Sequence, residues 1–297
     1  MSLATGLPLW QRREKLVALL LLGPAVVYLL ALSIYPTIYS LWIAFHNYSL
    51  YRRDLVSFAG IDNFTDLLDS DVFKQSLQVT LVFAAAAVLV ELILGFAIAV
   101  LLDRKMRGAN VLRTLLIIPV LISPVAMGLT FRYIFAPTYG LLTYLMRSAH
   151  LPTADWTVSV NWALPVVIFA DVWQWTPFVA LILLSGMQSV STEVTEAAEL
   201  DGLSEWQKLW RIVVPLIRPV LLVVVLIRLI DTIRMFDLVF VMTRGGPGSV
   251  TEVLSLFSYV TGFASGDMGS ASAIAWVTLV LVNILVAIFL RFLSKTA

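Results

Sequence analysis

Residues 191–219 read STEVTEAAELDGLSEWQKLWRIVVPLIRP, and the interpretation of the chain starts from this stretch. Its first part predicts a short helix that ends at Asp201-Gly202, because glycine readily adopts the left-handed backbone found at helix ends. Ser204 and Gln207 have the spacing of a capping box, which predicts a second short helix. Pro215 then marks the start of an apolar segment. Two short amphipathic helices at a sharp turn must rest on the remaining chain or dock into a partner.

On both sides of this stretch the chain is strongly apolar. Of the 297 residues, 60% are hydrophobic and 13% are charged, whereas a soluble domain carries about 25% charged residues. This composition excludes a water-soluble globular protein. A helix needs about 20 apolar residues to cross a bilayer. The sequence therefore predicts an all-α integral membrane protein with six transmembrane helices, at about 16–45, 79–102, 111–136, 161–190, 216–243 and 268–290.

Six spans place both chain ends on the same side of the membrane. If residues 1–15 and 293–297 are cytoplasmic, the cytoplasmic segments, including the 191–215 loop, carry about twice as many Lys and Arg residues as the outer segments. Because positively charged short loops stay in the cytoplasm, we expect this orientation. The first apolar segment is longer than the apolar core of a signal peptide, so we expect a retained helix.

The residues that the chain lacks exclude several functions. It has no Cys, which excludes disulfides and thiolate metal sites, and a net charge of +1 argues against an extended nucleic-acid surface. The glycines near Gly245 lack the Gly-Lys-Ser/Thr of a phosphate-binding loop. The two histidines, His46 and His150, lie far apart in the sequence. We therefore expect no catalytic residue, metal site or bound cofactor on this chain.

The loop at 191–215 resembles a known motif. Glu196-Ala197-Ala198, Gly202 and Ile212-x-Val214-Pro215 resemble the EAA loop of ABC-importer permeases, with Val214 where that family usually has Leu. The residues Thr243-Arg244-Gly245-Gly246-Pro247 are similar to the TxGGP signature of carbohydrate-uptake permeases related to the maltose importer. Residues 60–64 and 104–108 resemble other segments of that group, and the resemblance extends over about 16–292.

This resemblance implies the permease subunit of an ATP-driven importer for a sugar, an oligosaccharide or a sugar derivative, in a prokaryotic inner membrane. It implies that a coupling helix and its turn dock into a cytoplasmic ATPase through Glu196, Ala197, Ala198, Asp201 and Gly202. The implied partners are a second, similar permease, two copies of the ATPase, which uses ATP and Mg, and an extracytoplasmic binding protein. Transport would proceed by alternating access, driven by closure of the ATPases.

Ionisable residues within spans are candidate substrate contacts, because such residues normally face the bundle interior or a water-filled path. Polar groups can bond sugar hydroxyls, and aromatic rings can cover the apolar faces of a sugar. At 100° per residue, one face of the fifth span carries several such residues, and a helical i, i+3, i+4, i+7 stripe occurs in the fourth. The predicted substrate site therefore consists of Asp171, Gln174, Trp175, Phe178, Arg228, Asp231, Thr232 and Met235.

Other interpretations of these charges stay open. Arg234 and Asp237 lie on another side of the fifth span and suit a structural ion-pair ladder, while a substrate role is favoured for Arg228 and Asp231. Glu91, in the second span, suits a hydrogen bond between helices more than a proton relay. The alternative function is a secondary transporter driven by protons or sodium through such carboxylates. A membrane enzyme is a further alternative, against which the missing catalytic constellation speaks.

Overall fold

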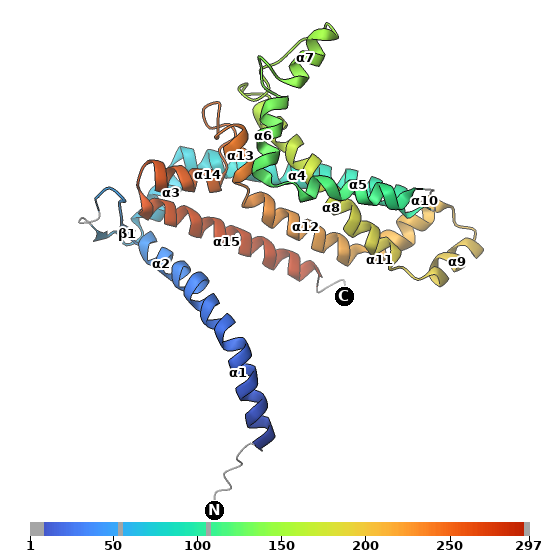
Figure 1. Ribbon diagram of the computed structural model, residues 1–297, viewed down its shortest axis with the longest axis horizontal. Helices are drawn as coiled ribbons and strands as arrows, with labels where there is room; N and C mark the ends of the chain where they lie inside the picture. Colours follow the sequence, from blue (N-terminus) through green and yellow to red (C-terminus); the bar gives the residue numbers. More distant parts are fainter. Residues whose placement is uncertain (1–8, 53–55, 105–107, 294–297) are drawn as a thin grey trace, which may run out of the picture.

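The computed structural model describes residues 9–52, 56–104 and 108–293, which are almost entirely helical (Figure 1). Four helices in this part of the chain are long and apolar enough to cross a membrane, and two bent helix pairs raise the number of candidate spans to six if each pair is one span. The all-α membrane fold expected from composition is confirmed. Residues 1–8, 105–107 and 294–297, which belong to the predicted chain ends and to the 104–108 motif, lie outside the described residues.

The four unbroken spans differ from the sequence prediction mainly at their ends. The first begins at Leu9 rather than at residue 16, and the second begins at Asp71 rather than at residue 79. Ser70 caps the second span, because its side chain accepts a hydrogen bond from the Phe73 amide. In chain order these spans are α1 (Leu9–Leu29) with η1 (Leu30–Ile34) and α2 (Tyr35–Ala44), then α4 (Asp71–Asp103), α8 (Ala163–Gln188) and α15 (Met268–Leu293).

The third span, expected as one helix at 111–136, is two helices. α5 (Ala109–Leu121) and α6 (Pro124–Ile134) are bent by 93° relative to each other. Ile122, between them, has an extended backbone. Pro124 explains the break, because proline lacks an amide hydrogen and disfavours helical backbone at the residue before it. The prediction of one continuous span was wrong here, since apolar length alone does not reveal a bend.

The fifth span, expected at 216–243, has a bend at its predicted start and one interruption further along. A bend of 66° separates Glu205–Leu216 from α12 (Arg218–Ile233), between Pro215 and Pro219. α12 then stops, and α13 (Asp237–Met242) begins after three residues that are not helical. The Ser255 hydroxyl donates a hydrogen bond to the Met235 carbonyl at this break. A side chain that takes up a main-chain carbonyl interrupts the helical ladder, so the single continuous span was again a wrong prediction.

Shorter elements complete the described chain. Strands β1 and β2 form one antiparallel pair, and the predicted helix–turn–helix at 191–215 is present as two short helices around Gly202. The remaining elements are β1 (His46–Asn47), β2 (Ser57–Phe58), α3 (Asp62–Asp69), α7 (Leu141–Ser148), α9 (Thr192–Leu200), α10 (Glu205–Lys208), η2 (Leu209–Val213), α11 (Val214–Leu216), α14 (Leu254–Tyr259) and η3 (Val260–Ala264).

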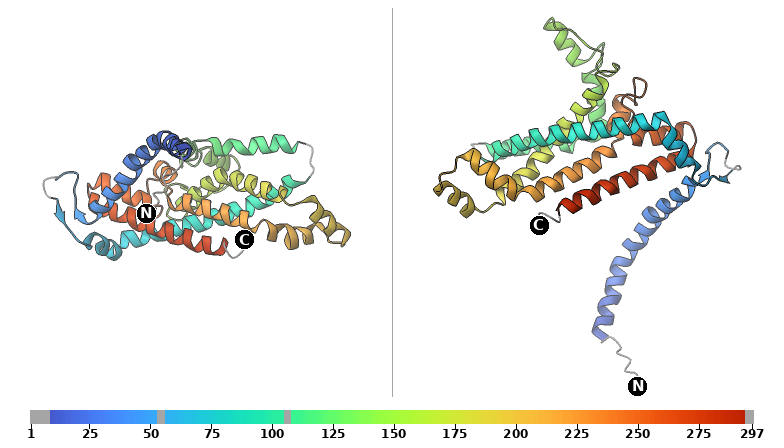
Figure 2. Two further views of the ribbon diagram at one scale, coloured as in Figure 1. Left: turned by 90° about the horizontal axis from the view of Figure 1, so that it is seen from below. Right: turned by 180° about the vertical axis from the view of Figure 1, so that it is seen from behind.

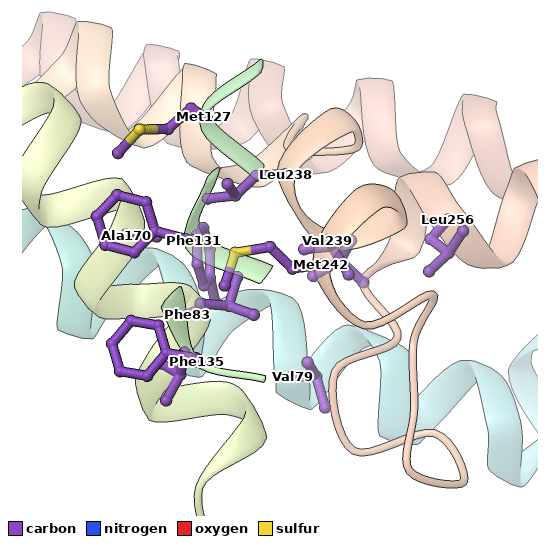
Figure 3. Packing of buried hydrophobic residues seen from close by; sticks show 13 residues of the cluster. Val79, Phe83, Met127, Phe131, Phe135, Ala170, Leu238, Val239, Met242 and Leu256 are labelled. Atoms are coloured by element: carbon purple, nitrogen blue, oxygen red, sulfur yellow. The ribbon is translucent and has the colours of Figure 1, made fainter. Parts of the chain in front are cut away.

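The core lies around the α4–α8 pair. A Cβ on Gly95 of α4 would lie 2.7 Å from Val179 Cγ1 of α8, so the absence of a side chain permits this close approach. An apolar cluster joins α4 and α8 to α6, α13 and α14 (Figure 3). Phe83, Phe131 and Leu238 belong to it and are buried. This cluster fixes α6 and α13, the second helices of the two broken spans, relative to α4 and α8.

The first span stands apart from this core. Figures 1 and 2 show α1 leading away from the bundle, while the end of α2 contacts α15 and accepts a hydrogen bond at the Ala44 carbonyl from Asn63 of α3. None of the residues in its apolar window is buried within the chain. The helices that pack around α4 and α8 therefore form a bundle, and α1 with α2 forms an arm attached to it.

Candidate functional site

A fully buried ion cluster joins three spans. Arg228 of α12 donates from Nε to Glu91 Oε2 at 2.7 Å and from Nη2 to Glu91 Oε1 at 2.8 Å. Its Nη2 also donates to Asp171 Oδ2 of α8 at 2.8 Å. All three side chains have 0% exposure. Because bidentate guanidinium–carboxylate pairs fix both distance and orientation, Arg228 ties α12 to α4 and α8.

Three further predicted site residues lie around this cluster. The Trp175 ring centroid is 4.7 Å from Arg228 Cζ, a cation–π distance, and Phe178 meets Trp175 edge-on at 5.8 Å between ring centroids. Asp231 Oδ2 is 3.7 Å from Arg228 Nη1, and its side chain is 47% exposed. These contacts bring Asp171, Trp175, Phe178, Arg228 and Asp231 together, as two stripes on two helices predicted.

The cluster leaves two buried atoms without a hydrogen bond in the described part of the chain. They are Asp171 Oδ1 and Arg228 Nη1. Unpaired buried polar atoms are rare in folded proteins. Here both belong to the same charged cluster, next to the half-exposed Asp231. The cluster therefore combines a tightly bonded buried part with a more accessible polar edge.

The other predicted site residues serve the backbone. Gln174 donates from Nε2 to the Ile122 carbonyl at 2.8 Å, which satisfies the acceptor exposed by the break between α5 and α6. The Thr232 hydroxyl donates to the Arg228 carbonyl of its own helix at 2.8 Å. Met235 lies in the break after α12, so the helical rotation that placed it beside Arg228 does not extend to it. Its place in the substrate site stays a prediction.

Two sequence interpretations of charged residues have different outcomes. The interpretation of Glu91 as a group that hydrogen-bonds between helices is confirmed, although the sequence did not identify Arg228 as its partner. The ladder proposed for Arg234 and Asp237 is wrong, since no ion pair joins them in the described residues and both are exposed. The missed signal was charge balance, because a buried arginine needs carboxylates from neighbouring spans.

The turn predicted around Gly202 forms the second candidate region, called here the elbow (residues 192–208). Gly202 has a φ of +77°, and the capping box of Ser204 and Gln207 is present, so both local predictions are confirmed. Lys208 Nζ lies 2.7 Å from carboxylate oxygens of both Glu199 and Glu205. This contact lowers the pKa of Glu199, mainly through the hydrogen bond from Lys208.

The elbow presents its predicted coupling residues to its surroundings. Glu196, Ala197, Asp201 and Gly202 are exposed, and only Ala198 is buried, at 3% exposure. Leu200, at the end of α9, is 89% exposed. Four of the five predicted coupling residues are therefore accessible at the surface of this chain.

Residues 91–297 match the family described as binding-protein-dependent transport system inner membrane component. The chain belongs to this family. The permease is therefore a multi-pass membrane subunit of a transport system, and the resemblance carried by the EAA-like loop is confirmed.

Curated relatives cover nearly the whole permease. It is 36% identical over 259 residues to a probable ABC transporter permease of Sinorhizobium fredii, covering 87% of this chain and 83% of the relative. It is 32% identical to a trehalose/maltose transport system permease of Thermococcus litoralis, covering 94% of both chains. A trehalose transport system permease of Mycobacterium tuberculosis is 31% identical over 96% of this chain and 91% of the relative.

Solved structures share the fold. The permease resembles a chain of a bacterial ABC transporter involved in the import of the acidic polysaccharide alginate, with a TM-score of 0.85, 21% identity and coverage of 97% and 98%. It also resembles a chain of the methionine ABC transporter MetNI, with a TM-score of 0.57, 15% identity and coverage of 80% and 99%. At these identities the likeness shows the fold alone.

Proposed function

We propose that the permease is one half of the membrane pore of an ATP-driven importer for a sugar, an oligosaccharide or a sugar derivative. The observation that carries this proposal is the match along 94% of its length to a trehalose/maltose permease. Relatives named for sulfoquinovosyl glycerol and for sn-glycerol-3-phosphate extend the likeness to anionic polyols. The shared chemistry of these named substrates is a polyhydroxylated molecule, with or without an anionic group.

The site around Trp175 supports a polyhydroxylated substrate. Trp175 and Phe178 are partly exposed and perpendicular to each other, and Asp231 offers an exposed carboxylate beside them. Aromatic rings suit the apolar faces of a sugar, and carboxylates accept bonds from its hydroxyls. Asp171, Gln174, Arg228 and Thr232, which are buried, would hold this wall in place. Met235, in the break, would contribute at most an apolar edge.

A groove next to this wall supports a path through the bundle. It has a volume of about 430 Å³ and is bounded by Phe178, Ser185 and Val220, among other residues of α5, α8 and α12. Ligand pockets commonly measure about 300–1,000 Å³. Phe178 therefore borders both the Trp175 wall and the groove, as expected for a residue along a transport path.

The elbow is proposed as the contact with the motor. A cleft of a cytoplasmic ATPase, which uses ATP and Mg, would hold Glu196, Ala197, Ala198, Asp201 and Gly202. With the elbow on the cytoplasmic side and six spans, both chain ends would be cytoplasmic. A second, similar permease, two ATPase copies and an extracytoplasmic binding protein complete the proposed complex. ATP would favour one of the two pore conformations through its different affinity for the closed and open ATPase pair.

The test is uptake by a reconstituted complex in proteoliposomes, with the binding protein and labelled trehalose outside and ATP inside. We expect accumulation that requires ATP and that ionophores leave unchanged. Uptake that survives removal of the ATPase and collapses with an ion gradient would instead establish the secondary-transporter alternative. Product analysis of the same vesicles distinguishes transport from an enzymatic conversion.

A matched pair of variants tests the wall. Trp175 packs on Arg228, whereas Trp173 is 41% exposed and packs against Phe131. We expect W175A to raise the KM for uptake by tenfold or more, since stacking on an aromatic side chain contributes about 1–3 kcal/mol for a nucleic-acid base and we assign a comparable contact to the sugar ring. W173A is the control, and equal effects of both variants would contradict the assignment.

A further inference from the structure

The exposed face of α12 changes character along its length. Val223 and Ile227 are 40% and 37% exposed, and Asp231 and Arg234 continue the same exposed stripe at helical spacing. Asp237, the first residue of α13, is exposed as well. One side of the fifth span is thus apolar near its Pro219 end and carries three charges near the break.

These three charges are not neutralised by one another. In the described residues no ion pair joins any two of them, and Asp231 alone forms one, with the buried Arg228 at 3.7 Å. The Arg234 and Asp237 side chains have no ion-pair partner there. A charge in a span is costly when it faces hydrocarbon, and such residues normally face water or protein. The charged stripe is therefore unsuited to a lipid-facing surface.

The backbone beside these charges leads to the same conclusion. Residues 234–236 are not helical. Irregular backbone within a span is tolerated only where protein buries it or where it borders water. Ser255 bonds the Met235 carbonyl in this segment, and the side chains of Arg234 and Asp237 beside it are exposed. Helix breaks of this kind place polar groups where a transported substrate can reach them.

We propose, on the basis of the importer function above, that Asp231, Arg234 and Asp237 line the water-filled path and contact the hydroxyl groups of the sugar. Arg234 is the only cation of the three. It lies one helical turn beyond Asp231, which adjoins the Trp175 wall through Arg228. A guanidinium between two carboxylates offers donors and acceptors to a neutral polyol, and its removal leaves a surface that repels anions.

The chain contains no Cys, so the introduced thiol is the only one on this subunit, and its reaction is followed on this subunit alone. R234C and D237C, assembled in the full complex in proteoliposomes, are treated with a charged, membrane-impermeant methanethiosulfonate reagent. The controls are I284C, at a 53% exposed apolar position of α15, and V224C, at a buried position of α12. We expect R234C and D237C to react at least tenfold faster than both controls. Reaction no faster than that of I284C would overturn the water-filled path.

A second measurement addresses substrate contact. We expect R234Q to raise the KM for trehalose uptake by fivefold or more with little change in kcat, and R234K to recover part of that loss. An unchanged KM in R234Q, with a complex that elutes as the wild type does, would overturn the contact. If the wild-type complex takes up no sugar, the proposed function fails, whereas the thiol reactions still decide whether these residues border water.

Discussion

One cation bridges two carboxylates at two places in the permease. Inside the bundle, Arg228 holds Glu91 and Asp171 at 2.7 and 2.8 Å, and in the elbow Lys208 holds Glu199 and Glu205 at 2.7 Å. The first group has 0% exposure throughout, whereas the two glutamates of the second are 58% and 79% exposed. Nearly equal distances therefore occur in opposite environments.

The comparison teaches that burial, rather than contact distance, sets what each cluster does. Removing one partner of a buried pair leaves an uncompensated charge that cannot reach water. Water and salt screen an exposed pair, which contributes little. Arg228 should thus determine how three spans are held together. Lys208 should adjust the elbow, where Gly202 and the capping box already fix the backbone.

The largest effect is expected from Arg228→Leu. It leaves Glu91 and Asp171 buried without their partner, which costs about 3–5 kcal/mol. Thermal unfolding of the purified complex should show a large fall in melting temperature or a loss of assembled protein. Arg211→Leu, at an exposed position of η2, is the control. A melting temperature like that of the wild type would mean that the cluster does not hold the spans.

A triple replacement tests the reason for that loss. In E91L/D171L/R228L no charge stays buried, and apolar side chains of similar size can replace buried ion clusters at little cost. We expect the triple variant to regain most of the stability lost in R228L, measured by the same unfolding experiment. If it is as unstable as R228L, the effect lies in packing rather than in unpaired charge.

Gly202→Val should act on coupling rather than on the bundle. A Cβ at residue 202 meets no atom within 4 Å, but φ is +77°. A β-branched residue in this region is strained by about 1–2 kcal/mol. We expect ATP hydrolysis without matching uptake in the reconstituted complex. Gly202→Asn, which tolerates this backbone, should retain coupling, and normal uptake in Gly202→Val would contradict the role of the turn.

Lys208→Ala is expected to have about a tenth of the effect of Arg228→Leu on unfolding, because exposed pairs contribute little. In this variant the capping box of Ser204 and Gln207 still holds the start of α10. Thermal unfolding at low and high salt is the measurement. A loss comparable to that of Arg228→Leu would remove the distinction between the two clusters.

The smallest effect concerns pH at the elbow. Because Lys208 lowers the pKa of Glu199, folding is favoured above the unfolded-state pKa of about 4.3. This contribution is lost as the pH falls through the lower folded-state value. Fluorescence of a label on Val194→Cys, at an exposed position of α9, should report loosening of the elbow in that range. The transition should be absent in Lys208→Ala, and an identical transition there would assign it to another group.

Much of the permease followed from local sequence signals. The capping box, the left-handed Gly202 and the helical character of the apolar segments depend on neighbours a few residues apart, and all were predicted. Stripes on two helices also brought five of the eight predicted site residues together. The breaks in the third and fifth spans were not predicted. Apolar length alone does not reveal the break before Pro124, and at the break after α12 the hydrogen bond comes from Ser255 of a different helix.

The sequence by itself determined that the chain is a helical membrane protein with an EAA-like elbow, because apolar length and short motifs are local properties. The tertiary structure decided which charges are buried and which are open. Arg228 meets carboxylates 57 and 137 positions away, and periodicity within one helix carries no information about such partners. The roles of Arg228 and Arg234 therefore depend on how the spans pack around them.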